Sequence, residues 1–116
     1  GGNESDASDI VAVVLSLSEQ TAVPTAFALE QNYPNPFNPS TQIRYALPEA
    51  TSVTITVYDM MGRKIKILVQ DNQVAGYYTA LWNATNDRGF PVSAGMYIYM
   101  LQAGDHHEIK KMILLK

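Results

Sequence analysis

From residue 27 onward, apolar and polar residues alternate with a period of two along several short stretches. Successive side chains of a β-strand point to opposite faces, so this pattern is typical of strands that bury one face. The inward faces that it predicts are Phe27 and Leu29; Ile43, Tyr45 and Leu47; Val53, Ile55 and Val57; Tyr78, Ala80 and Trp82; and Tyr97, Tyr99 and Leu101. Residues 108–115 form the last predicted strand.

Turn signals separate these stretches. Asp59 and Gly62 bound a four-residue hairpin connection, because aspartate can bond the backbone of its own turn and glycine supplies a positive φ. In the return strand 63–69, Ile65 and Leu68 differ in parity, so we expect a bulge or an early strand end. Residues 70–76 are expected to form a polar turn. Together the pattern predicts a seven-stranded antiparallel sandwich with Greek-key connections.

Prolines interrupt the alternation between the first two strands. Pro34, Pro36 and Pro39 fall within six residues, and each fixes its own φ and pushes the residue before it into extended geometry. Residues 33–40, called the proline loop below, are therefore expected to be stiff and extended. Tyr33 and Phe37 place two large rings on this polar loop, and we expect both rings to cover a surface.

The first 26 residues have a different character. A polar start leads into an apolar, β-branched run at residues 10–17, which favours a strand, with a short helix capped near Ser8 or Asp9 as the alternative. Residues 19–26 are polar, contain Pro24 and are expected to be a linker. The chain begins at Gly1-Gly2 without Met, so we expect it to be a piece of a longer polypeptide.

Length, charge and composition exclude several classes of protein. The 116 residues suit one domain with a single core. A net charge of −3, from 8 basic and 11 acidic residues, predicts no nucleic-acid partner and no binding to an anionic membrane. The longest apolar run, residues 10–15, is far shorter than the ~20 residues of a membrane helix, and we expect no signal peptide. Cysteine is absent, which excludes disulfides and thiolate chemistry.

Few residues suggest catalysis or cofactor binding. No serine lies in a strand–turn–helix elbow and no glycine-rich phosphate loop is present, so we expect no enzyme activity and no cofactor. Trp82 is expected in the core. His106 and His107 are adjacent, so on a strand they would point to opposite faces and could not share a metal ion; we expect them to be solvated turn residues.

Asn83, Asn86 and Asp87 are the candidate metal ligands of the sequence. Calcium prefers 6–8 oxygen ligands and usually several carboxylates, whereas this loop offers the single carboxylate of Asp87. Asparagine and aspartate in a tight loop more often form hydrogen-bonded turns, so we expect turns here and no metal site.

A series of motifs carries a family resemblance over residues 26–116. The motifs are residues 27–41, which include the proline loop; Ile43, Tyr45, Leu47 and Pro48; Val57-Tyr58-Asp59; Gly62-Arg63; Ala75-Gly76; Trp82-Asn83; Gly95-Met96-Tyr97 with Tyr99; and residues 110–116. In this order they resemble the C-terminal sorting domains of bacterial type IX secretion cargo, and equally the Ig-like domain of flagellar hook-capping proteins. The resemblance implies an Ig-like sandwich, and the loop at 83–89 leans toward the hook-capping version.

The resemblance to sorting domains implies a non-catalytic tail that takes upstream passenger domains of the same chain through an outer-membrane translocon. The passenger would pass the periplasm and reach the cell surface or the medium. The residues to which it assigns recognition are Gly95, Tyr97, Gly104, Lys110, Lys111 and Lys116. Charged residues also discourage pairing at an exposed strand edge, so the three lysines have an adequate structural explanation as well.

Two alternatives remain open. Residues 1–18 resemble the final loop and last strand of a fibronectin type III domain, and such an orphan strand could pair with a neighbouring domain or with a second copy of the chain. The protein would then be a structural Ig-like module of an extracellular or flagellar assembly. The last alternative is a carbohydrate-binding module, for which Tyr77, Tyr78 and Phe90 are the aromatic candidates.

Overall fold

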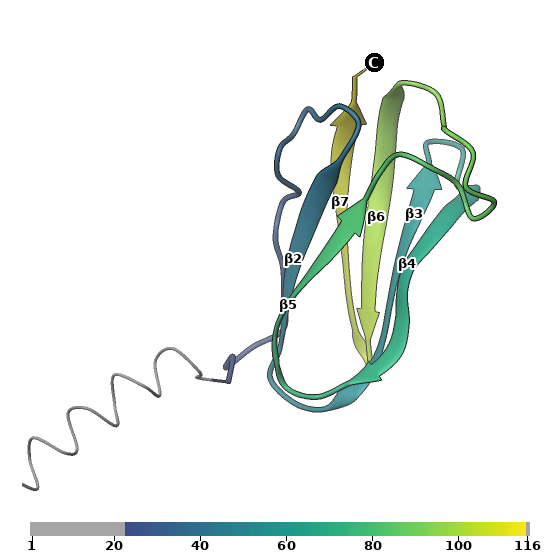
Figure 1. Cartoon of the computed structure of the whole chain (residues 1–116). Helices are drawn as coiled ribbons and strands as arrows, with labels where there is room; N and C mark the ends of the chain where they lie inside the picture. Colours follow the sequence, from purple (N-terminus) through teal and green to yellow (C-terminus); the bar gives the residue numbers. More distant parts are fainter. Residues whose placement is uncertain (1–22, 116) are drawn as a thin grey trace, which may run out of the picture.

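The computed structural model describes residues 23–115, where all regular secondary structure is β-strand (Figure 1). The strands are β1 (Ala28–Leu29), β2 (Thr41–Leu47), β3 (Thr51–Asp59), β4 (Lys64–Gln73), β5 (Gly76–Trp82), β6 (Gly95–Ala103) and β7 (His106–Leu114). The described residues include no helix that could cross a membrane. The predicted strand at residues 10–17 and the first half of the predicted linker, residues 19–22, lie outside the described residues.

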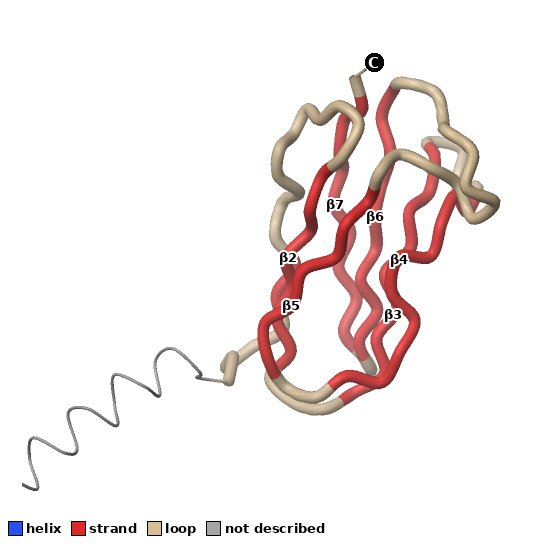
Figure 2. The backbone as a smooth tube through the Cα atoms, viewed as in Figure 1, coloured by secondary structure: helices blue, strands red, loops and turns tan. Residues whose placement is uncertain are grey.

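The strands form two antiparallel sheets that face each other (Figure 2). One sheet has the order β1-β2-β5 and the other the order β4-β3-β6-β7. The chain changes sheet between β2 and β3, between β4 and β5, and again between β5 and β6. These interleaved connections confirm the predicted seven-stranded antiparallel sandwich with Greek-key connections.

The alternating pattern identifies the core. All the predicted inward side chains are buried except Phe27 and Tyr78, which are partly exposed and pack against the edge of the core. Trp82 is 1% exposed, as expected, and its ring centroid lies 5.7 Å from that of Phe37 and 5.4 Å from that of Tyr97. Its indole Nε1 donates a hydrogen bond to the carbonyl oxygen of Thr85 at 2.8 Å. One aromatic cluster thus joins the two sheets and the proline loop.

The return strand, β4, contains two bulges, at the positions where the alternation of inward and outward side chains is interrupted. Ile55 pairs with Val69 but Thr56 pairs with Ile67, which leaves Leu68 as an extra residue of β4. The second register shift, between Val57 and Tyr58, leaves Ile65 extra in the same way. The expected bulge is therefore confirmed.

The predicted end of that strand is wrong. β4 continues to Gln73, and residues 70–73 pair with residues 51–54 of β3 instead of forming a polar turn. β4 is one of the two edge strands of its sheet, so polar side chains there remain in water while the backbone still gains its hydrogen bonds.

The prediction for the two histidines is also wrong, because both lie in β7. Gly104 has a φ of +59° and turns the chain with Asp105, so pairing resumes at once with Ala103 opposite His106. The His106 ring stacks on Phe27 with ring centroids 4.9 Å apart. Because Gly104 and Asp105 complete the turn, His106 and His107 already belong to the strand.

Replacing Trp82 with alanine is expected to lower the free energy of unfolding by about 3–5 kcal/mol, because it empties a buried aromatic site. Leu81→Ala is the matched control: Leu81 is the neighbour on β5 but is 72% exposed, so its loss is expected to change stability by less than about 0.5 kcal/mol. Urea denaturation of the two variants measures the difference. Equal losses would contradict the central role of Trp82.

Candidate recognition site at the last strand

β7 is an edge strand that pairs with β6 on one side. Of the residues predicted to carry recognition, Gly95 lies opposite Leu114 and Tyr97 lies opposite Met112 in this hairpin. Lys110 and Lys111 face Tyr99 and Ile98 across the same pair of strands, Gly104 forms the turn, and Lys116 lies outside the described residues. The structure thus brings the five described residues onto one β-hairpin, with Gly95 and Gly104 at its opposite ends.

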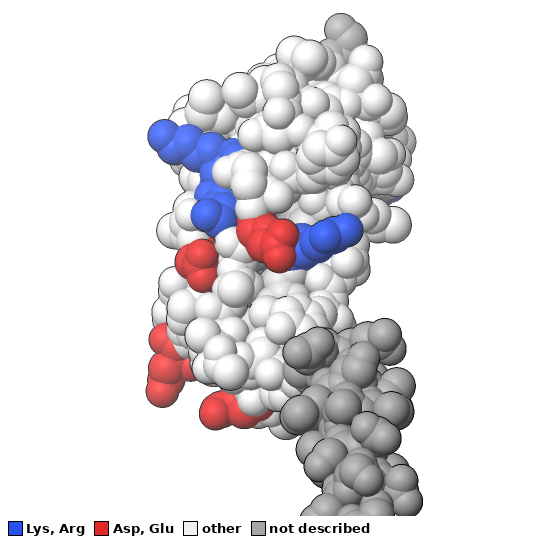
Figure 3. Space-filling view, turned by 90° about the vertical axis from the view of Figure 1, so that its left-hand side faces the viewer, with Lys and Arg blue, Asp and Glu red and all other residues white. Residues whose placement is uncertain are grey.

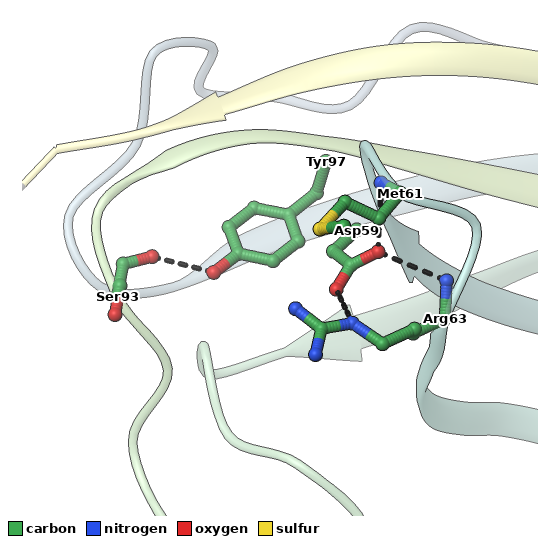
Figure 4. Close-up of polar contacts among 5 residues, drawn as sticks. All are labelled: Asp59, Met61, Arg63, Ser93 and Tyr97. Atoms are coloured by element: carbon green, nitrogen blue, oxygen red, sulfur yellow. Dashed lines mark hydrogen bonds and ion pairs between the residues drawn. The ribbon is translucent and has the colours of Figure 1, made fainter.

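These residues differ in accessibility. Tyr97 is buried, and its hydroxyl donates to the carbonyl oxygen of Ser93 (Figure 4). Burial raises the pKa of Tyr97, and the negative charge of Asp59 adds to the effect. Lys111 is exposed on the outer face, whereas Lys110 has the inward parity of Met112 and is half-buried. Lys111 is thus directly accessible to a partner, whereas Tyr97 is buried in the packing of the hairpin.

Acidic and basic residues occupy different parts of β7 and the turn before it. Asp105 and Glu108 lie at the turn end, and Lys110 and Lys111 lie closer to the C-terminal end. Figure 3 shows basic side chains in the upper half of this side of the molecule and acidic ones at and below its middle. An inward-pointing lysine such as Lys110 also blunts an exposed strand edge, so edge protection and recognition are compatible.

The proline loop pairs with the outer edge of β7 by backbone hydrogen bonds. The Phe37 amide donates to the carbonyl of Ile113 at 3.0 Å, and the Leu115 amide donates to the carbonyl of Phe37 at 2.8 Å. The two segments run parallel at this bridge, which matches Phe37 with Leu114. The end of β7 is therefore bonded on both of its edges.

Two side-chain amides extend this contact. Asn35 Oδ1 accepts a hydrogen bond from the Ile113 amide at 3.0 Å. Gln31, two residues before the loop, donates from Nε2 to the carbonyl of Lys111 at 2.6 Å. The backbone groups of residues 111, 113 and 115 thus point toward the loop, as the alternation of a strand requires. Within residues 23–115, no backbone-to-backbone bond reaches the outward groups of His107 or Ile109.

Tyr99 holds the segment just before the proline loop in place. Its hydroxyl donates to the carbonyl of Glu30 at 2.7 Å and accepts a hydrogen bond from the Asn32 amide at 2.8 Å. The Asn32 side chain is buried and donates to Thr41 Oγ1 at 2.9 Å and to the carbonyl of Pro34 at 3.1 Å. Burial raises the pKa of Tyr99 to about 12. A neutral hydroxyl on β6 therefore anchors the segment that bonds β7.

The two rings of the proline loop do not behave alike. Phe37 is 1% exposed, as expected, but Tyr33 is 72% exposed, so the prediction for Tyr33 is wrong. Tyr33 forms an isolated bridge with Gln42 at the border of the outer sheet face, where no second layer covers its ring.

Sequence reasoning identified the hairpin but missed Gln31 and Asn35. Their contacts with Lys111 and Ile113 join residues 80 and 78 positions apart. The one available signal was Phe37, an apolar ring on a polar loop that had to be buried against some other segment.

Of the candidate metal ligands, Asn83 and Asn86 bond within their own loop, and Asp87 bonds β4. Asn86 Oδ1 accepts hydrogen bonds from the amides of Arg88 and Phe90. Asn83 Oδ1 accepts one from the Thr85 hydroxyl, and Asp87 Oδ1 accepts one from the Ile67 amide. Within the described part of the chain, no three histidine, aspartate or glutamate side chains gather in a way that could hold a metal ion.

A second polar cluster lies at the β3–β4 turn (Figure 4). It borders the β6–β7 hairpin, because Asp59 pairs with Tyr97 across β3 and β6. Asp59 Oδ1 accepts hydrogen bonds from the amides of Arg63 and Met61, and Oδ2 accepts one from Arg63 Nε at 2.8 Å. The hydrogen bond from the Arg63 amide is the main cause that lowers the pKa of Asp59. Gly62, with a φ of +86°, completes the predicted turn.

The family model described as "secretion system C-terminal sorting domain" matches residues 31–115. No curated protein sequence matches the chain. Among solved structures, the chain is similar to the dimeric latent PorU from Porphyromonas gingivalis, with a TM-score of 0.60 and 19% identity. That match covers 78% of this chain and 9% of the PorU chain.

The chain is also similar to two FlgD structures. FlgD from Xanthomonas campestris, which is linked to hook capping in flagellar assembly, matches with a TM-score of 0.52 and 23% identity, over 78% of this chain and 63% of that one. FlgD from P. aeruginosa matches with a TM-score of 0.50 and 21% identity, over 64% of this chain and 58% of that one. At such identities the likeness establishes the shared Ig-like fold alone.

The anchoring tyrosine predicts a dependence of stability on alkaline pH. Tyr99 keeps its proton up to about pH 12 in the folded state, whereas an unfolded tyrosine loses it near pH 10. The free energy of unfolding is therefore expected to fall as the pH rises from about 10 to 12. In Tyr99→Phe this fall is expected to be shallower, with the remainder due to Tyr45 and Tyr97, whose pKa burial also raises.

Urea midpoints measured across this range test the prediction. Tyr77→Phe, a change at a 69% exposed residue, is the control and should keep the slope of the unmodified chain. An unchanged slope in Tyr99→Phe would count against a buried, anchoring hydroxyl.

The Asp59 turn predicts the opposite dependence at acid pH. Because the pKa of Asp59 is lowered on folding, the unfolded chain binds the proton first, and stability is expected to fall as the pH drops below about 3.9. Asp59→Asn is expected to be less stable at neutral pH and to lose less on acidification. Thermal melting between pH 2 and 6 compares the two proteins. A steeper acid loss in Asp59→Asn would contradict the stabilising role of the ionised carboxylate.

Proposed function

Since the chain belongs to the family of secretion system C-terminal sorting domains, we propose that it is the sorting tail of a larger protein exported by the type IX route. The observation that carries the proposal is the family match over residues 31–115, which confirms the resemblance stated from the motifs. Such a tail implies secretion to the cell surface or the outside, contact with secretion machinery and a larger passenger.

The finer steps are part of the same proposal. The passenger lies upstream in the same polypeptide, crosses the periplasm with the tail attached, and leaves through an outer-membrane translocon. Residues 1–18 are the last strand of a preceding fibronectin III-like domain, residues 19–26 are a linker, and residues 27–116 are the sorting domain. The tail performs no catalysis and carries no cofactor.

The outer face of β7 is the part of the tail best suited to recognition. Lys111 projects there, between Ile109 and Ile113, which are 61% and 38% exposed. Leu115 follows with 51% of its surface exposed. Exposed apolar side chains on both sides of a lysine form a strip that a partner can bind through hydrophobic and charged contacts together. Tyr97, Gly95 and Gly104 support this strip by maintaining the hairpin.

The proposal predicts that the tail is sufficient and necessary for export. A reporter fused in front of residues 1–116 is expected to reach the medium or cell surface in a bacterium with a working type IX system, and a fusion lacking residues 111–116 is expected to stay in the periplasm. Fractionation and protease accessibility of the reporter measure the outcome. Export that persists without these six residues would contradict the proposal.

The deletion also removes Met112 and Leu114, which are buried, so a milder variant is needed. Lys110→Gln with Lys111→Gln keeps the core, and we expect it to lower export several-fold without changing the melting temperature of the purified chain. Lys64→Gln with Lys66→Gln is the matched control, because these lysines lie on β4, the opposite edge of the same sheet. Periplasmic retention of every fusion would favour the structural Ig-like module instead.

A further inference from the structure

We propose that Gln31, Asn35 and Phe37 are positioning residues that hold the C-terminal strand in the form that the secretion machinery binds. The inference rests on the proposed function and adds to it a second element, remote in sequence from the strand itself. All of the hydrogen bonds that link these residues to β7 and Leu115 end on backbone groups of residues 111–115.

An edge strand needs such support. Segments that are bonded on one side open locally at little cost, because few buried contacts oppose their opening. β7 pairs with β6 on one side, and the contact with Phe37 pairs its end on the other side. The last described residues therefore have the hydrogen-bond environment of a central strand, although they close the sheet.

The three residues have different structural roles. Phe37 is buried and packs against Trp82, so it fixes the loop to the core. Gln31 and Asn35 are exposed, and their amides reach the backbone of β7 from the solvent side. Because these contacts use backbone groups, the exposed side chains of Lys111 and Ile113 stay free of them and accessible to a partner.

The direction of each hydrogen bond gives the proposal a sharp test. Asn35 accepts through Oδ1, and an aspartate can accept in the same place. Gln31 donates through Nε2 to the carbonyl of Lys111 and to Asn32 Oδ1, and a glutamate has no proton to donate and would set a carboxylate against both oxygens. The same kind of change, amide to acid, is thus expected to be tolerated at residue 35 and harmful at residue 31.

The first measurement is amide hydrogen exchange of Ile113 and Leu115 by NMR in the purified 116-residue chain. Gln31→Glu and Asn35→Ala are expected to speed the exchange of these amides by about five- to tenfold, the factor that corresponds to one lost hydrogen bond. Asn35→Asp and Asn38→Ala, the latter at an exposed position of the same loop, are expected to stay within about twofold of the unmodified chain. The melting temperature is expected to change little in all four.

The second measurement is export of the reporter fused to the same four variants. Export is expected to drop several-fold for Gln31→Glu and Asn35→Ala and to be retained by Asn35→Asp and Asn38→Ala. Exchange that does not change, or full export of the two harmful variants beside an exported unmodified tail, overturns the positioning role and leaves the proposed function intact. Retention of the unmodified fusion in the periplasm overturns both.

Discussion

The burial of Trp82 between Phe37 and Tyr97 is the contact on which the other features of this domain depend. Trp82 belongs to β5 in one sheet, Tyr97 to β6 in the other, and Phe37 to the proline loop. The cluster therefore joins both layers of the sandwich to the proline loop. Without it the loop would have no apolar anchor, and its polar contacts with β7 would have to form in competition with water.

The edges of the sandwich explain why that anchor matters. An open sheet always leaves unpaired backbone groups at its border, and three of the four edge strands of this domain show different forms of protection. β4 is bent by two bulges and carries Lys64 and Lys66, whereas β1 is two residues long. β7 is bonded by the proline loop over its final residues and carries an inward-facing lysine before them. This edge is thus protected by backbone hydrogen bonds while its outward side chains stay exposed.

The candidate site was predictable only in part. The family resemblance placed Gly95, Tyr97, Gly104, Lys110 and Lys111 on the final strands, and the structure puts all of them on one hairpin, although recognition by these residues stays a prediction. Gln31 and Asn35 could not be found from the sequence. Their partners are backbone groups, which every residue has, so no residue type at positions 111 or 113 signals the contact.

Local chemistry determined the strands and their inward faces, because the alternation of side chains is a property of neighbouring residues. It also determined the bulges at Ile65 and Leu68 and the hairpin turn at Asp59 to Gly62. The tertiary structure alone decided how far β4 extends, that His106 and His107 join a strand, and that Phe37 is buried while Tyr33 is exposed. Each of these outcomes depends on which distant strand or layer lies alongside. Every residue has the same backbone groups, so no residue type in the sequence indicates which of them will pair.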